Sequence, residues 1–552
     1  MKKLRILLLL VALVSAACVL VACGGGGSDP ADPIAEKLKF SQKSDGTYAV
    51  AIGNAIDQTK IEIPASYKGK AVTEIAYQGF SSKHLEHVTV PKSVTTIGWG
   101  AFSECTKLKS VTILSNITAI EASVFENCPS LQSVTIPSGV TSIGSKAFYG
   151  CVSLADIEIP SSVTTIGMQA FAGCTSLTGV ELPSSVRSLG YKAFYGCTSL
   201  ASVKIPSTVH TIEWGTFAEC TALKSIEIPQ NVTSIEYAAF ANCKALAKVS
   251  LSDTVTKIGE HAFYGCSALV SITIPRSVTA IEASAFEECY TLVEIINKSD
   301  LAIHKGAASK SFITAYAKDV HSGESRIESL DGYLFATYEG VHYLLGYSGD
   351  SADLMLPDDL HGERYEIHPY AFYACDLLSS VVISDGVVKV GDFAFASCTS
   401  LTMIAIPESV TAIGNDAFSA CEGLITVTLH NGLQTIGERA FAKCTSLSGI
   451  ALPSTADSIG AYAFHGCTAL TSITIPESVD LIGAYAFLEC ENLASVIFEN
   501  PHEWWCATPA DTTLGTVIPS AHLKSTETAA SYLTFIFPSR VWMRDVPESK
   551  IN

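Results

Sequence analysis

The chain has 552 residues, of which 48% are hydrophobic and 16% are charged. This composition excludes a chain that is disordered over most of its length, because disordered chains are poor in apolar residues. Asp and Glu number 54 against 35 Lys and Arg, which gives a net charge of −19. An acidic chain repels phosphate backbones, so we expect no nucleic-acid partner.

The N-terminus has the pattern of a bacterial export signal. Lys2, Lys3 and Arg5 precede the mostly apolar run 7–21, which is short for a membrane span and typical of a signal peptide. The run leads into Leu-Val-Ala-Cys, which ends at Cys23 and resembles the lipobox of bacterial lipoproteins. This resemblance implies cleavage before Cys23 and acylation of that cysteine, with palmitate among the chains attached. A plain signal peptide with an incidental cysteine is the alternative.

Fifteen cysteines mark a repeat. They form two series with neighbours 23 residues apart, from Cys105 to Cys289 and from Cys375 to Cys490. Each has Phe three residues before it and Leu three residues after it, in the unit C-x-x-L-x-x-V-x-I-P-x-x-V-x-x-I-G-x-x-A-F-x-x. A period of about 20 to 29 residues is that of leucine-rich repeats, which stack into solenoids.

The spacing within one repeat predicts the structure of one coil. The V-x-I step alternates as in a strand, and the following Pro ends the strand because it cannot donate to a ladder. The later apolar residues are three or four positions apart, which predicts short helical or 3-10 turns on the opposite side. Stacking would cover the apolar residues of each coil and align the strands in a parallel sheet, about 4.8 Å apart. The Gly after the second Ile is replaced by Glu in some coils, so we expect close packing rather than a positive φ to favour Gly there.

The repeat resembles the BspA-type leucine-rich repeats of bacterial surface proteins over about residues 37–500. This resemblance implies a leucine-rich repeat solenoid, mainly β with short turns, on a protein attached to the bacterial cell surface. It also implies an adhesin. The expected partners are host extracellular-matrix proteins or other cell-surface proteins and glycans, and the membrane is contacted only through the lipid anchor. In a Gram-negative cell this would be the outer membrane.

The two cysteine series indicate two stacked arrays. The gap from Cys289 to Cys375 is 86 residues, which is not a multiple of 23. Turns at Asp45-Gly46 and Asp331-Gly332, flanked by alternating residues, predict a hairpin N-cap on each array. A single solenoid with an insertion is the alternative. The residues 310–320, between the arrays, have a helical pattern.

The expected organisation is therefore a signal peptide (1–22), a Gly/Ser tether (23–36), a first solenoid with its cap (37–300), a linker (301–328), a second solenoid with a hairpin cap (329–500) and a C-terminal cap or tail module (501–552). The tail carries three of the five Trp residues and has apolar residues at near-helical spacing from Ser525 to Phe537. We interpret it as a cap over the last coil, with a small binding module as the alternative.

No catalytic signature is present. The sequence contains no G-x-S-x-G, H-E-x-x-H, phosphate-binding loop or EF-hand loop. It also contains no C-x-x-C, and no His recurs beside the cysteines, so we expect structural thiols and neither a metal site nor a cofactor. We therefore expect a protein that is not an enzyme.

Two surfaces of the coils are candidate ligand sites. The position six residues before the cysteine holds large side chains on four successive coils and on one earlier coil, and exposed aromatic patches often mark contacts with proteins or glycans. This candidate stripe contains Trp99, Met168, Tyr191, Trp214 and Tyr237. The outward positions of the V-x-I strands give the candidate strand-face contacts Asp156, Glu158, Glu181, Lys204, Glu227 and Lys248. The alternatives are local packing for the stripe and a solvated acidic face for the strand residues.

Two other functions stay open. The chain could be a structural surface spacer without a specific ligand. It could also be an enzyme or glycan-processing accessory that acts through the tail, although the tail lacks a paired acid and base.

Overall fold

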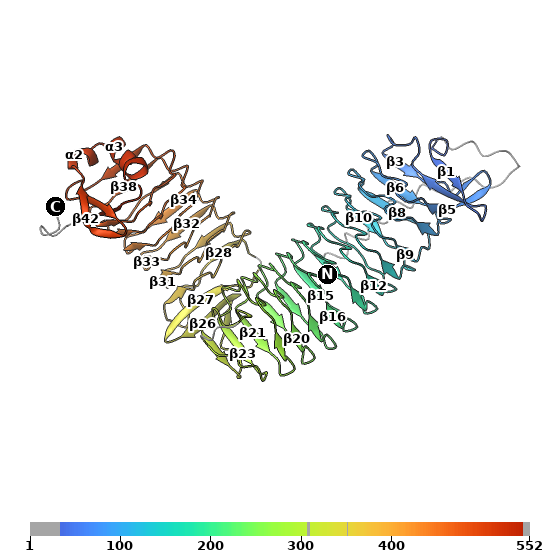
Figure 1. The fold of residues 1–552 in the computed structure, drawn as a ribbon, viewed down its shortest axis with the longest axis horizontal. Helices are drawn as coiled ribbons and strands as arrows, with labels where there is room; N and C mark the ends of the chain where they lie inside the picture. Colours follow the sequence, from blue (N-terminus) through green and yellow to red (C-terminus); the bar gives the residue numbers. More distant parts are fainter. Residues whose placement is uncertain (1–33, 306–309, 350, 545–552) are drawn as a thin grey trace.

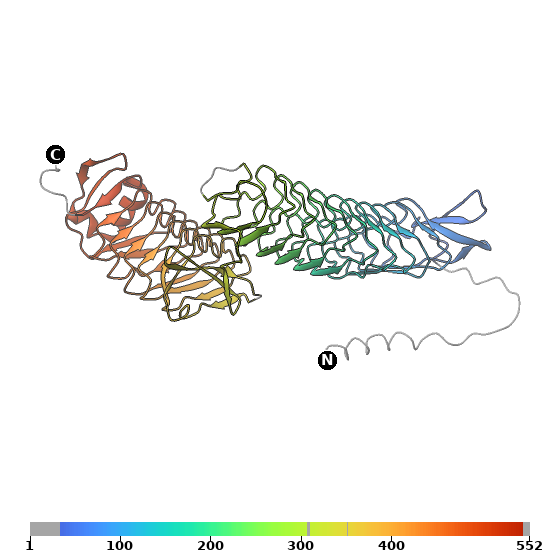
Figure 2. The same cartoon turned by 90° about the horizontal axis from the view of Figure 1, so that it is seen from below.

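The computed structural model describes residues 34–305, 310–349 and 351–544. They form two arms of stacked coils that meet at an angle (Figures 1 and 2). The proposed signal peptide and Cys23 lie outside the described residues, as does most of the tether. The predicted β-rich solenoid of stacked coils is confirmed.

The V-x-I steps form the first row of strands. Equivalent residues of neighbouring coils pair in parallel and in register, as Val111 does with Val134. In the first arm this row contains β3 (Lys60–Glu62), β6 (His87–Val90), β8 (Ser110–Ile113), β10 (Ser133–Thr135), β13 (Gly179–Glu181), β15 (Ser202–Lys204), β17 (Ser225–Glu227), β19 (Lys248–Ser250), β21 (Ser271–Ile274) and β23 (Glu294–Asn297). In the second arm it contains β28 (Asp353–Met355), β30 (Ser380–Val382), β32 (Met403–Ile406), β34 (Thr426–Leu429), β36 (Gly449–Ile450), β38 (Ser472–Ile475) and β40 (Ser495–Phe498).

One coil of the first row departs from the prediction. Residues 156–159 form no strand, although Ile157 and Ile159 are buried as the pattern requires. Glu158 would lie directly opposite Glu181 in a continuous ladder, and like charges opposite each other oppose strand pairing.

A second row of short strands, most of them two residues long, was not predicted. It is formed by the residue pair before the Gly position, most often Thr-Ile or Ser-Ile, and it also pairs in parallel and in register. Two alternating residues are too short a pattern to predict a strand from the sequence. In the first arm the row contains β7 (Thr96–Ile97), β9 (Ala119–Ile120), β11 (Ser142–Ile143), β12 (Thr165–Ile166), β14 (Ser188–Leu189), β16 (Thr211–Ile212), β18 (Ser234–Ile235), β20 (Lys257–Ile258) and β22 (Ala280–Ile281). In the second arm it contains β29 (Tyr365–Ile367), β31 (Val387–Val390), β33 (Ala412–Ile413), β35 (Thr435–Ile436), β37 (Ser458–Ile459) and β39 (Leu481–Ile482).

Single turns connect the two rows, and their backbone groups also pair between coils. Within a coil, the backbone N–H of Cys151 donates to Phe148 and that of Leu154 donates to Cys151, each across three residues as in a 3-10 turn. Between coils, the N–H of Phe148 donates to the carbonyl of Ala170 at 2.7 Å. The turns therefore add to the stack rather than only closing each coil.

Close packing explains the Gly position of the repeat, as predicted. Gly190 does not have a positive φ, and a Cβ added to it would lie 2.5 Å from the carbonyl carbon of Gly167 in the preceding coil. Any side chain there requires the neighbouring backbone to shift.

The core of each arm is a ladder of Phe rings beside a ladder of thiols. Centroids of successive Phe rings lie 5.0 to 5.6 Å apart. All the cysteines of the described ranges are free, and each ladder Sγ except that of Cys375 donates to the carbonyl of the Phe in the preceding coil, at 3.0 to 3.3 Å. Burial raises the pKa of most of these thiols, to about 12 for Cys197, whereas a hydrogen bond with the Cys128 thiol lowers the pKa of Cys105. The expectation of structural thiols agrees with this geometry, but the hydrogen bond to Phe was not predicted.

Hairpins precede the coils of both arms, as predicted. β1 (Lys39–Gln42) and β2 (Tyr48–Ala51) pair in an antiparallel hairpin. β2 then pairs in parallel with β5 (Lys70–Ile75), which also pairs with β4 (Ser66–Tyr67). The second arm begins with an antiparallel unit of β25 (Glu328–Leu330), β26 (Tyr333–Tyr338) and β27 (Val341–Tyr347). β27 then pairs in parallel with β29. Each hairpin covers the apolar end of its stack.

The helix predicted over residues 310–320 is wrong. This segment forms turns and then β24 (Asp319–His321), which pairs in parallel with β23. The N–H groups of Ser284 and Phe286 donate to the carbonyls of Lys310 and Ser311, so the segment follows the path of another coil. Its backbone is hydrogen-bonded to the stack, and this overrides the weak helical spacing.

The buried apolar residues form two main clusters, one for each arm, with a small third cluster between them. The small cluster joins Val270 and Val293 of the first arm to Ala336 and Leu345 of the hairpin. Tyr290 also stacks on Tyr370 of the second arm, with ring centroids 4.5 Å apart. On this basis we propose the division into two arrays, with residues 310–321 as a further coil of the first arm rather than as part of the linker 301–328.

The C-terminal tail packs on the last coil of the second arm. It contains β41 (Trp505–Thr508), β42 (Asp511–Val517), β43 (Val541–Met543), helices α2 (Ser520–Leu523) and α3 (Thr526–Ser531), and the π-helix η1 (Tyr532–Ile536). β43 pairs with β39, and the buried Trp504 and Trp542 belong to the core of this arm.

Candidate ligand-binding surface

The backbone places the stripe at the surface. Each stripe residue comes two positions after the end of its second-row strand. The residue that follows it has a positive φ, as Gln169, Lys192 and Gly215 do. The chain turns sharply there, so the preceding side chain points away from the core. Exposed fractions are 42% for Trp99, 41% for Met168, 43% for Trp214 and 42% for Tyr237, and Tyr191 is half-buried.

Three stripe residues form one contiguous aromatic patch. The ring centroids of Tyr191 and Trp214 are 4.5 Å apart, and those of Trp214 and Tyr237 are 5.4 Å apart. Tyr237 also meets the ring of His261 edge-on at 5.4 Å. The patch therefore extends over four successive coils.

Trp99 belongs to a separate patch. Its ring stacks on Tyr77, with centroids 5.0 Å apart, and Ala122 and Ser145 occupy the stripe position on the coils before Met168. Tyr77 was missed because its coil has Lys83 in place of the cysteine. The Phe80 of that coil would have revealed it.

A lysine already lies beside the aromatic patch. Lys192 Nζ is 5.8 Å from the ring centroid of Tyr191, 5.6 Å from that of Trp214 and 4.7 Å from that of Tyr195. These distances are within the range of cation–π attraction.

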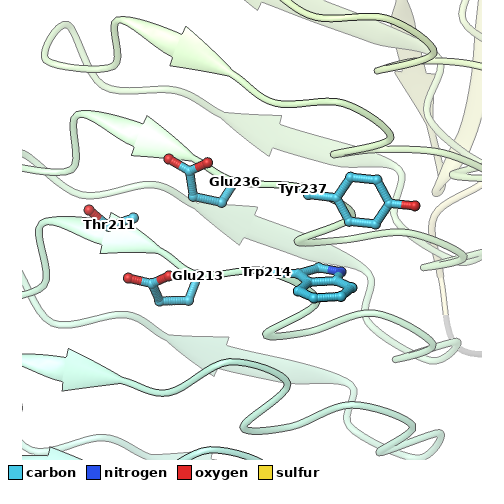
Figure 3. Close-up of a pocket in the computed structure, with 5 residues that line it drawn as sticks. All are labelled: Thr211, Glu213, Trp214, Glu236 and Tyr237. Atoms are coloured by element: carbon cyan, nitrogen blue, oxygen red, sulfur yellow. The ribbon is translucent and has the colours of Figure 1, made fainter.

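An open depression lies next to Trp214 and Tyr237, with a volume of about 770 Å³ (Figure 3). Thr211, Glu213 and Glu236 complete its lining. Burial, and then the negative charge of Glu236, raise the pKa of Glu213. Glu236 in turn is paired with Lys257 at 3.5 Å and accepts a hydrogen bond from Ser234. The two carboxylates were predicted only as replacements of Gly, not as part of a site.

The six candidate strand-face residues are all exposed. They do not form one acidic patch, because Glu181 is the register partner of Lys204, and Lys248 lies on β19, which pairs with the strand of Glu227. Asp156 and Glu158 lie in the coil without a first-row strand. Within the described ranges no group of three His, Cys, Asp or Glu side chains could hold a metal ion.

Cys506 in the tail is the one cysteine of the described residues that lies outside the two ladders. Cys506 is buried, which raises the pKa of its thiol, and His502 is exposed.

Among the residues that the structure describes, no helix is long and apolar enough to cross a membrane.

Comparison with known proteins identifies the repeat. The family model for the BspA type leucine rich repeat region matches residues 73–201, 141–267, 188–314 and 365–501, which together span more than half of the chain. A search of curated proteins finds no match.

Several solved structures are similar to the chain. A leucine-rich repeat protein from Bacteroides ovatus is 24% identical, with 83% of this chain and 92% of that chain covered and a TM-score of 0.38. A leucine rich cell surface protein from Faecalibacterium prausnitzii is 25% identical, with 88% and 96% covered and a TM-score of 0.26. The T. pallidum leucine rich repeat protein is 27% identical, with 43% and 89% covered and a TM-score of 0.28.

Proposed function

Because the chain belongs to the BspA-type leucine-rich repeat family, we propose that it is a bacterial cell-surface protein that binds macromolecular ligands through the faces of its solenoid. The more specific proposal is an adhesin, with host extracellular-matrix proteins or cell-surface proteins and glycans as partners. The contiguous rings of Tyr191, Trp214 and Tyr237 at the surface are the observation that supports a binding role best.

Exposed aromatic rings of this kind suit recognition. Tyr and Trp bury a large apolar area on binding and lose little conformational entropy, so they dominate the binding energy of many interfaces. Repeats also hold them rigidly, because each coil is hydrogen-bonded to both neighbours through strands and turns. A row of exposed rings, tilted against one another, could contact an extended protein segment or a glycan chain.

Replacing Tyr191 and Trp214 together by Ala tests this role. We expect the double variant to bind partners captured by the wild-type protein at least about tenfold more weakly, since buried aromatic hot spots are worth about 2 kcal/mol or more each. Residues 24–552 contain the whole described structure, so this chain can be used for capture from host matrix proteins and bacterial surface glycans. Affinities are then measured by surface plasmon resonance.

A tyrosine pair in the second arm provides the control. Tyr462 and Tyr485 are half-buried and stack with centroids 4.8 Å apart, so their replacement by Ala removes a similar pair of rings elsewhere. The control variant should keep its affinity. If the Tyr191/Trp214 variant bound every captured partner unchanged, the proposed binding surface would be wrong.

We also propose that Cys23 carries the lipid anchor. The Leu-Val-Ala-Cys sequence supports this proposal, and the Gly-rich segment that follows it would hold the solenoid away from the membrane. Metabolic labelling with a palmitate analogue should mark the wild-type chain and not Cys23→Ser. Equal labelling of both would exclude acylation at this cysteine.

The alternatives make different predictions. A spacer would retain no partner in the capture experiment. An enzyme that acts through the tail would lose its activity when residues 501–552 are disabled, whereas an adhesin of the first arm would keep its binding. Because the tail caps the core of the second arm, point substitutions at exposed tail residues such as His502 are preferable to truncation.

A further inference from the structure

The depression beside the aromatic patch combines two features on two successive coils. In these coils the Gly of the repeat is replaced by Glu, and the next residue is aromatic, which gives Glu213-Trp214 and Glu236-Tyr237. Figure 3 shows the two carboxylates side by side on one edge and the two rings side by side on the other. The neighbouring coils have Gly190-Tyr191 and Gly259-Glu260. Only the coils of Glu213 and Glu236 therefore combine a Glu at the Gly position with an aromatic residue after it.

The replacement of Gly by Glu is unfavourable for packing. At Gly259 of the next coil, a Cβ would lie 2.9 Å from the carbonyl carbon of Glu236. A side chain at this position therefore requires the coils to adjust. The two Glu side chains are also like charges on adjacent coils, and this proximity contributes to the raised pKa of Glu213.

The carboxylates are only partly compensated. Lys257 Nζ lies 3.5 Å from Glu236 and is shared with Glu282 at 3.1 Å. The Glu213 carboxylate has neither an ion-pair partner nor a hydrogen-bond donor among the residues that the structure describes. A cation placed in the depression would face both carboxylates and the faces or edges of both rings.

The chemistry of the lining selects an organic cation. Two carboxylates are too few for a calcium ion, which takes about six to eight oxygen ligands. Lys and Arg side chains, by contrast, combine cation–π attraction with charge-assisted hydrogen bonds to carboxylates. Lys192 shows that this surface accepts such a cation, since its Nζ already lies 5.6 Å from the Trp214 ring.

The geometry points to a docking site for the Lys or Arg side chains of a partner protein, formed by Glu213, Glu236, Trp214 and Tyr237. This inference rests on the proposed function, because it specifies the kind of ligand that the aromatic patch binds. The net charge of −19 complements a basic partner segment.

Titration calorimetry of residues 24–552 tests the site with three probes: a hexa-arginine peptide, a hexa-citrulline peptide and an N-acetylglucosamine hexamer. Citrulline has nearly the shape of arginine without its charge. We expect hexa-arginine to bind and the other two probes not to bind. Binding of hexa-citrulline with equal affinity, binding of the glycan alone, or no binding of hexa-arginine would overturn the inference.

Two variants with the same change of net charge separate the site from general electrostatics. Glu213→Gln with Glu236→Gln should weaken hexa-arginine binding at least about tenfold, because charge-assisted hydrogen bonds are lost. Glu158→Gln with Glu181→Gln, on the first-row side of the coils, should change it about twofold or less at 0.15 M salt. Equal weakening by both pairs would overturn the inference. Circular dichroism checks that each variant is folded.

The two proposals fail in different ways. If a captured partner loses affinity for the Tyr191/Trp214 variant and keeps its affinity for the Glu213/Glu236 variant, the aromatic surface stands and the cation site is wrong. If neither variant weakens binding, both proposals are wrong.

Discussion

Replacing Phe194 by Ala is expected to lower the free energy of unfolding by about 3 to 5 kcal/mol. Phe194 is fully buried, and its ring stacks between those of Phe171 at 5.3 Å and Phe217 at 5.6 Å. The rigid stack cannot close around the missing ring without breaking its inter-coil hydrogen bonds, so a cavity would remain. Because every coil contacts only its neighbours, the loss would weaken two interfaces at once. Urea unfolding followed by circular dichroism measures the effect.

An exposed Phe in the tail is the matched control. Phe535 is 80% exposed, so Phe535→Ala should change the free energy of unfolding by no more than about 0.5 kcal/mol. Equal midpoints for the Phe194→Ala variant and the wild-type protein would contradict the stacked core described above.

Replacing Glu294 by Ala should both destabilise the protein and alter the junction of the arms. The side chain is 0% exposed and accepts hydrogen bonds from Ser325 Oγ and the backbone N–H of Arg326, each at 2.6 Å. His321 Nε2 lies 3.2 Å from the same carboxylate. Removing the carboxylate loses hydrogen bonds to a buried charged group, each worth about 1.5 to 3 kcal/mol, although the exposed Ser325 and Arg326 can bond to water instead.

The position of Glu294 makes the effect structural as well. It lies on β23 of the first arm, whereas Ser325 and Arg326 lead directly into β25 of the second arm's cap. Without the carboxylate, this connection is no longer held against the first arm. Small-angle X-ray scattering should therefore show a changed radius of gyration for Glu294→Ala, and no change for the exposed control Glu158→Ala. An unchanged scattering profile together with an unchanged unfolding midpoint would exclude this role of Glu294.

Much of the fold could be predicted because fifteen copies of the repeat carry the same sequence pattern. Cys, Phe and Leu at fixed offsets fix the length of the coil, and the V-x-I alternation fixes the first row of strands. The second row could not be predicted, since two residues are too few to show a period. The coil over residues 310–321 was also missed, because Phe312 has no cysteine three residues after it, as the repeat would require.

The candidate site was predicted only in part. The stripe position follows from the repeat, so Met168, Tyr191, Trp214 and Tyr237 could be aligned by counting. Glu213 and Glu236 could not be joined to them, because the sequence does not show that adjacent residues project to the same side at this turn. Glu294 has the same position in its repeat as the exposed Asp156. It is buried only because the segment after β24 folds over it.

Hydrogen exchange of residues 24–552 with and without a captured partner tests the central claim most directly. If the aromatic patch is the ligand surface, binding should slow exchange of backbone amides in segments 188–192, 211–215 and 234–238 of the first arm, which carry Tyr191, Trp214 and Tyr237. The tail and the second arm should exchange as in the free protein. Slower exchange confined to residues 501–544 or to the second arm, with these three segments unchanged, would contradict the account.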